Sequence, residues 1–169
     1  MKELEAWENR PPEEANLYNP AFLGSLIFEF VKAFDKEKPN QTPLTLIPIA
    51  LSIVLFAKSR KRLPSSTITS FYDWVQRNED LLIGFAKRTA DFVPNFKEGL
   101  RFAILGKAIL IGEDHYLVLG QQRVHFPQSF IKNTTAEVKD IINKTKFVSR
   151  WLVKSGSETS ILSACGVRL

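Results

Sequence analysis

The feature that most constrains the fold of this sequence is an apolar run over residues 44–57, interrupted only at Thr45, Pro48 and Ser52. The run is shorter than the roughly 20 residues that a membrane-spanning helix needs. A helix that is apolar nearly all round must be surrounded by other elements of the same fold. We therefore expect a core helix over about residues 44–58, with the rest of the chain packed around it, and no membrane partner.

Further helices are indicated by apolar side chains at helical spacing. Asn19-Pro20 is a good helix opening, with Asn as the N-cap and Pro in the first position, and a stripe of Phe, Leu and Ile follows up to Phe34. The pattern predicts a third helix capped by Ser65, Ser66 or Thr67, a fourth capped by Asn78, a fifth that begins at a break at Pro94, a long helix over 135–154 and a short one within 157–165. Residues 36–42 and 121–133 are expected to be irregular.

Two short apolar runs, 108–111 and 115–119, flank Gly112-Glu113-Asp114 and predict a β-hairpin. Helices followed by a hairpin predict a mainly α fold with a small β-hairpin, which we interpret as a winged-helix-like helical domain. We expect three parts: an acidic N-terminal arm (1–18), a winged-helix-like core with its hairpin wing near 107–120 (19–134), and a C-terminal helix and tail packed on the core (135–169).

The chain of 169 residues has a formal net charge of +5, but the charge is unevenly distributed. Residues 1–14 contain five Glu against Lys2 and Arg10, so the remainder of the chain is strongly basic. A basic body favours contact with nucleic acid or with an acidic partner surface. Candidate contacts, to DNA phosphates rather than bases or to a partner, are Arg60, Lys61, Arg62, Lys144, Lys146, Arg150 and Arg168. The alternative interpretation is a helix end that compensates the helix dipole, followed by a solvated helix face.

Three aromatic side chains lie in or next to segments of weak periodicity: Trp7, Phe130 and Trp151. Exposed aromatics near chain ends often mark partner contacts, so these three are candidate partner-contact residues. A place in the core is the alternative for Trp151.

Catalytic and metal-binding patterns are missing from the sequence. It has one cysteine, Cys165, and two histidines, His115 and His125, too few for a cysteine-rich or three-histidine zinc site. It contains no phosphate-binding loop, nucleophile elbow or His-Glu-x-x-His motif. We expect no enzyme activity, cofactor or metal. The single thiol and an N-terminus without an apolar leader favour a cytoplasmic protein.

Several short stretches follow one another in a characteristic order over residues 19–168: Asn19-Pro20-Ala21-Phe22, Ser59-Arg60-Lys61-Arg62-Leu63-Pro64, Thr69-Ser70-Phe71-Tyr72-Asp73-Trp74-Val75, Gly84-Phe85-Ala86-Lys87-Arg88, Val93-Pro94-Asn95-Phe96-Lys97-Glu98-Gly99-Leu100, Ser149-Arg150-Trp151-Leu152 and Gly166-Val167-Arg168. Their order resembles that of the middle component of bacterial three-component ABC systems, the Lamassu-type defence operons.

The resemblance implies a non-catalytic adaptor in an anti-phage or anti-plasmid defence complex. Its partners would be an SMC-like ABC ATPase and an effector subunit, commonly a nuclease, and the complex would couple sensing of foreign DNA to release of the effector. The alternative is a stand-alone winged-helix DNA-binding regulator. A third hypothesis is a hydrolase that uses Cys165 with His115 or His125.

Overall fold

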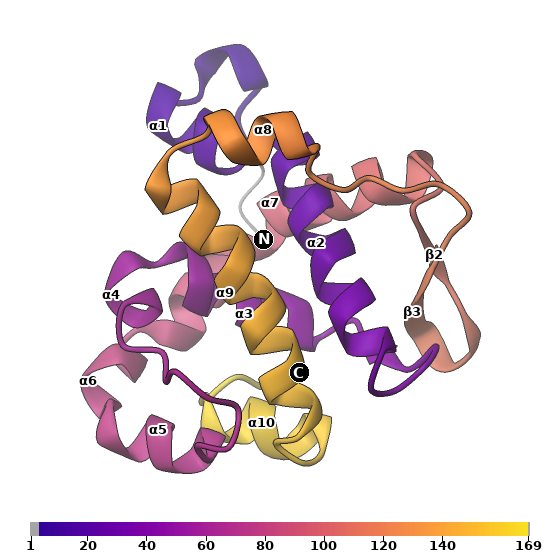
Figure 1. Ribbon diagram of the computed structural model, residues 1–169. Helices are drawn as coiled ribbons and strands as arrows, with labels where there is room; N and C mark the ends of the chain where they lie inside the picture. Colours follow the sequence, from indigo (N-terminus) through magenta and orange to yellow (C-terminus); the bar gives the residue numbers. More distant parts are fainter. Residues whose placement is uncertain (1–3, 169) are drawn as a thin grey trace.

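The computed structural model describes residues 4–168 and is mainly α-helical, as expected, with one small sheet. Four helices form the core: α2 (Pro20–Asp35), α3 (Leu46–Leu55), α7 (Phe85–Leu105) and α9 (Ala136–Val153). Both α2 and α3 pack against α7 and α9, so α3 lies inside the helical body (Figure 1). The predicted core helix is confirmed, but it ends at Leu55. Phe56 takes an extended conformation and separates α3 from the short α4 (Ala57–Arg60).

Local capping explains where three helices begin. The Asn19 side chain accepts hydrogen bonds from the backbone N–H groups of Ala21 and Phe22 at the start of α2. Thr135 caps α9 in the same way, and Ser157 caps α10 (Glu158–Ala164). These starts agree with the sequence prediction because each cap is a local contact.

The middle of the chain differs from the prediction. The helix that the sequence predicted as the third is α5 (Phe71–Arg77). Ser70 caps it, so the predicted cap at residues 65–67 is wrong. The Asn78 side chain donates to the Trp74 carbonyl instead of capping α6 (Glu79–Leu82). The chain then breaks at Gly84, whose φ of 70° suits glycine.

The predicted break at Pro94 is also wrong, because α7 continues through it. Proline removes the hydrogen bond that residue 94 would donate to the Ala90 carbonyl, and costs about 3 kcal/mol or more inside a helix. The apolar face of α7 is buried on both sides of this position, and α7 approaches α2 closely. A Cβ at Gly99 would lie only 2.6 Å from the Leu23 Cβ. Continuous packing against α2 therefore outweighs the proline penalty.

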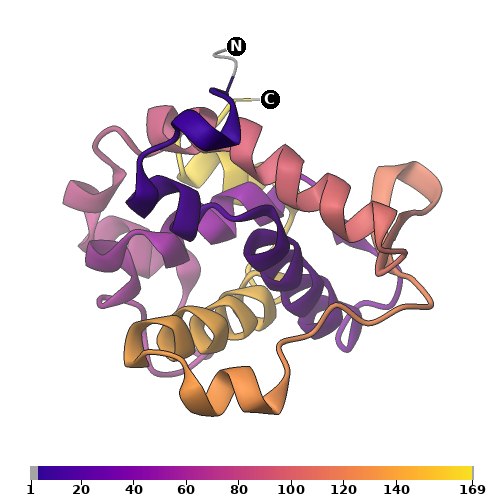
Figure 2. The ribbon, with the colours of Figure 1, turned by 90° about the horizontal axis from the view of Figure 1, so that it is seen from above.

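The sheet has three antiparallel strands in the order β1 (Thr42–Pro43), β3 (Tyr116–Leu119), β2 (Ile109–Ile111). The predicted hairpin is confirmed as β2 and β3, which project to one side of the helices in Figures 1 and 2. The strand β1 was missed because its partner is far away in the sequence. Residues 128–133, expected to be irregular, form α8 (Gln128–Asn133). The winged-helix assignment is not confirmed.

The N-terminal segment (residues 4–18) contains a 3₁₀ turn (Trp7–Asn9) and α1 (Pro12–Leu17). Arg10 donates from both terminal nitrogens to the Glu98 carboxylate of α7, each at 2.8 Å. This bidentate pair holds the segment against α7. The first three residues of the expected arm lie outside the described residues. Among the described helices, none has the length and hydrophobicity to span a bilayer.

Candidate functional site

The densest basic cluster of the sequence, residues 60–62, is largely neutralised by the fold. Arg60 is only 3% exposed. Its guanidinium donates to Glu137 at 2.6 Å and to Asp140 at 3.0 Å, both on α9. A third donor bonds the Val54 carbonyl at 2.8 Å. Arg60 therefore joins α4 to α3 and α9, and its charge faces the interior.

The two neighbouring cations lie on the surface. Arg62 pairs with Asp80 at 2.7 Å, and Lys58 approaches the same carboxylate at 2.9 Å. The hydrogen bonds from Lys58 and then Arg62 lower the pKa of the Asp80 carboxyl. Lys61 is exposed and forms no ion pair within residues 4–168. The cluster therefore presents less free charge than its sequence implies.

The outer face of α9 keeps more of its charge. Arg150 and Lys154 are exposed, four residues apart on one side of the helix. Lys146 lies 3.4 Å from the buried Glu29 carboxylate, and the Lys144 ammonium lies 5.4 Å from the centre of the Phe147 ring. Arg168 is exposed after α10, and Figure 2 shows this end of the chain across the molecule from α9. The structure therefore places Lys144, Lys146 and Arg150 on α9, with Lys144 on a different side of the helix from the other two, whereas Arg60 and Arg168 lie elsewhere.

Of the three candidate aromatic residues, one is buried and two are exposed. Trp151 is 1% exposed, packs edge-on against Phe71 and Trp74, and donates from its indole N–H to the Thr69 carbonyl at 2.6 Å. It is a core residue and not a surface contact. Trp7 and Phe130 are 42% and 40% exposed, on the N-terminal segment and α8. These two rings are available to a partner.

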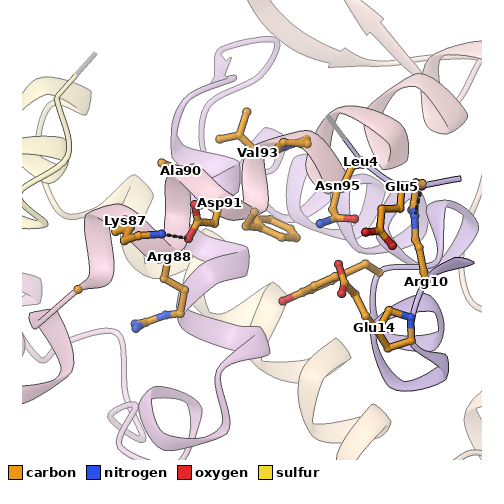
Figure 3. Close-up of a pocket in the computed structure, with 15 residues that line it drawn as sticks. Leu4, Glu5, Arg10, Glu14, Lys87, Arg88, Ala90, Asp91, Val93 and Asn95 are labelled. Carbon is orange, nitrogen blue, oxygen red and sulfur yellow. Dashed lines mark hydrogen bonds and ion pairs between the residues drawn. The ribbon is translucent and has the colours of Figure 1, made fainter. Parts of the chain in front are cut away.

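A cleft that the sequence reasoning missed lies between the N-terminal segment and the first half of α7 (Figure 3). Its volume is about 980 Å³. The sequence signal for this cleft was Pro94. Proline leaves the Ala90 carbonyl without its helical hydrogen bond, and both residues line the cleft. Asn95, also in the lining, is 3% exposed, and its Oδ1 has no hydrogen-bond partner. A buried acceptor left unpaired is costly, so this atom makes the cleft a candidate place for a ligand.

The two ends of the cleft differ in charge. At one end the Arg88 guanidinium lies 4.3 Å from the centre of the Phe56 ring, and burial lowers the pKa of Arg88. At the other end lie Glu5 and Glu14, both without an ion pair among the described residues. Burial and then the nearby Glu14 carboxylate raise the pKa of Tyr18. The cleft therefore has a cationic end and an acidic end.

The cysteine hypothesis for a hydrolase is not favoured by the environment of Cys165. The thiol is buried, and burial raises its pKa to about 12. The thiol is therefore protonated near neutral pH, and the thiolate is the reactive form. Within residues 4–168, His, Cys, Asp and Glu side chains form no group of three or more that could hold a metal ion. The described surfaces offer exposed rings, exposed cations and the cleft as places for binding.

Comparison with known protein families gives a match over nearly the whole chain. The family model described as "ABC-three component (ABC-3C) system Middle Component 3" covers residues 7–169. Neither a curated protein nor a solved structure matches significantly.

Proposed function

We propose a function that follows from one premise: this chain belongs to the ABC-three component system Middle Component 3 family. The chain acts as a non-catalytic adaptor. It bridges an SMC-like ABC ATPase and an effector subunit, a nuclease in the form we favour, and couples the sensing of foreign phage or plasmid DNA to release of the effector. In this proposal the assembly works in the cytoplasm as a Lamassu-type defence system.

The observation that carries the proposal is the extent of the family match. It covers residues 7–169, so the whole helical body belongs to a component of a multi-subunit system. The surfaces described above suit such a role, because partner contacts are enriched in aromatic side chains and arginine. Trp7 on the N-terminal segment and Phe130 on α8 are exposed rings, and Arg150 on α9 is an exposed cation.

DNA contact through this subunit is a further part of the proposal. Lys146 and Arg150 lie four residues apart on one face of α9, Lys154 continues their row, and Lys144 lies on another side of the helix. Cations on one helix face can contact successive phosphates without reading bases. The α9 face would then line the DNA path of the complex while the N-terminal segment and α8 contact protein partners.

The assembly is tested by co-expression with the ATPase and effector encoded by adjacent genes, with an affinity tag on the ATPase. We expect this chain to co-purify in fixed stoichiometry and to co-elute with both partners in size-exclusion chromatography. Elution of this chain only as a free monomer, with both partners folded and present, would contradict the proposal.

One observation favours the alternative, a stand-alone winged-helix regulator: a β-hairpin directly follows the long helix α7. A regulator of this kind is usually dimeric and reads the major groove with a helix. A dimer that binds a defined operator with steep salt dependence, and that ignores the ATPase, would support this alternative.

A further inference from the structure

The acidic end of the cleft offers hydrogen-bond acceptors in one place. We call the set formed by the Glu5 and Glu14 carboxylates and the Asn95 Oδ1 atom the acceptor pocket. Figure 3 shows both carboxylates turned toward the Asn95 side chain, from the N-terminal segment on one side and from α7 on the other. Segments far apart in the sequence therefore supply one pocket.

No side chain of residues 4–168 donates a hydrogen bond to the acceptor pocket. The Asn95 side chain is buried, and its Oδ1 accepts no hydrogen bond. Glu5 and Glu14 form no ion pair among residues 4–168. Because buried acceptors and clustered carboxylates are stabilised by a donor, the pocket is complementary to a ligand that only donates.

The nearest cations of the chain are already engaged. Arg10 gives both terminal nitrogens to Glu98, and its Nε to the Glu5 backbone carbonyl at 2.9 Å. Lys87 bonds Asp91 at 2.6 Å. Neither of these cations donates to the Glu5 or Glu14 carboxylate, so both carboxylates are open to a donor from another molecule.

We propose that the acceptor pocket takes the side-chain ammonium of a lysine from a partner subunit. An ammonium group carries three donors and no acceptor, which matches three acceptors on three separate residues. An arginine fork favours two oxygens of one carboxylate, the geometry that Arg10 already makes with Glu98. The described residues form no cluster suited to a metal ion.

The rest of the cleft suits the remainder of a lysine side chain. Beyond the acceptor pocket the cleft is lined by Phe92, Val93 and Pro94, and the Tyr18 ring packs on Phe92 with 5.5 Å between ring centres. A lysine stem packs along apolar surface while its charged head reaches a polar site. The N-terminal segment, acidic in an otherwise basic chain, adds charge complementarity to a basic partner segment.

This inference rests on the proposed adaptor function, and one experiment separates the two. The complex purified by co-expression is treated with a carbodiimide, which joins a carboxylate directly to a primary amine in contact with it. We expect mass spectrometry to identify an isopeptide link from Glu5 or Glu14 to a lysine of one partner. A complex that forms without such a link would overturn the inference and leave the adaptor proposal intact; the lack of any complex would overturn both.

Matched variants test the same contact by affinity. Glu14→Gln removes one acceptor charge from the pocket, whereas Glu13→Gln changes an exposed neighbour on α1 that does not line the cleft. We expect Glu14→Gln to weaken binding to the partner about tenfold, the value of one charged hydrogen bond, and Glu13→Gln to leave it unchanged. Both substitutions lie on a partly exposed helix, and circular dichroism checks that the fold is kept. Equal affinities for the two variants would contradict the inference.

Discussion

Two regions of this molecule contain the same residue types and use them in opposite ways. The inner region consists of two buried contacts, that of Arg60 on α4 with the first turns of α9 and that of Trp151 near the end of α9 with α5. We call these two contacts together the inner junction. The outer surface consists of Trp7, Phe130, Arg150 and Lys154, on the N-terminal segment, α8 and α9. Arg60 and Trp151 are almost completely buried, whereas the outer residues are exposed. Residue type therefore does not decide whether an arginine or a tryptophan is available to a partner.

The difference lies in the groups that surround each side chain. Burying an arginine is costly unless its donors are paired, and the inner junction provides two carboxylates and a backbone carbonyl for Arg60. It also provides the Thr69 carbonyl for the Trp151 indole N–H. On the outer surface Arg150 has no ion pair within the described residues, and its side chain is exposed to solvent. A cation is therefore structural where the fold places acceptors around its donors, and it is available to a partner where the fold places none.

The largest expected effect comes from Trp151→Ala. The substitution leaves a cavity among packed aromatic rings and an unpaired Thr69 carbonyl, so we expect the free energy of unfolding to fall by about 3–5 kcal/mol. Trp7→Ala, the matched substitution on the outer surface, should change it by less than about 0.5 kcal/mol. Urea unfolding followed by circular dichroism measures both. Similar losses from the two variants would break the comparison.

The next effect is that of Arg60→Ala. Because Glu137 and Asp140 are 65% and 44% exposed and regain water, we expect less than for a fully buried pair, about 2–3 kcal/mol. Arg62→Ala removes an exposed ion pair with Asp80 and serves as the control, with little change in stability. Urea unfolding measures the free energy of unfolding of both variants. If the Arg60→Ala variant were as stable as wild type, the charge of this arginine would not be needed inside the fold.

The sequence predicted what depends on neighbouring residues and missed what depends on distant ones. Asn19, Thr135 and Ser157 cap helices as local contacts, and the hairpin 108–119 is closed by its own turn. The continuation of α7 through Pro94 depends on packing against α2, which no local pattern contains. The strand β1 depends in the same way on β3, more than seventy positions later.

The same distinction explains the candidate contacts. Arg60 and Arg150 both follow apolar helical patterns, and only the position of α9 relative to α4 makes one buried and the other exposed. The cleft was missed because its acidic end joins Glu5 and Glu14 to Asn95, three residues that share no sequence motif. Its unpaired Asn95 Oδ1 can be recognised only once the surrounding atoms are placed.

A smaller effect concerns the pH dependence of stability. It comes from the ion pair that Arg10 of the N-terminal segment forms with Glu98 of α7. The hydrogen bonds from Arg10 hold the pKa of Glu98 below its ordinary value of 4.5. Between the two pKa values the unfolded chain binds more protons, so this contribution to stability is present above pH 4.5 and is lost as pH falls through the lowered value. We expect wild type and Glu98→Gln to differ in unfolding free energy near neutral pH and to converge as the pH falls through the lowered pKa of Glu98. A difference that stays constant with pH would contradict an ionic role for this pair.

The smallest expected change in stability comes from the double variant Arg150→Gln, Lys154→Gln on the outer face of α9. Neither cation has an ion pair among the described residues, so the free energy of unfolding should stay within about 0.5 kcal/mol of wild type. If this face lines the DNA path, as proposed, the double variant should reduce the salt dependence of duplex binding, with a slope of log K against log salt that is shallower by about 2. Lys58→Gln, which removes a cation already paired with Asp80, should leave the slope nearly unchanged. A normal slope in the double variant, with a stable fold, would show that free charge on α9 contacts protein or solvent and not phosphate. The comparison between regions would then hold for stability alone.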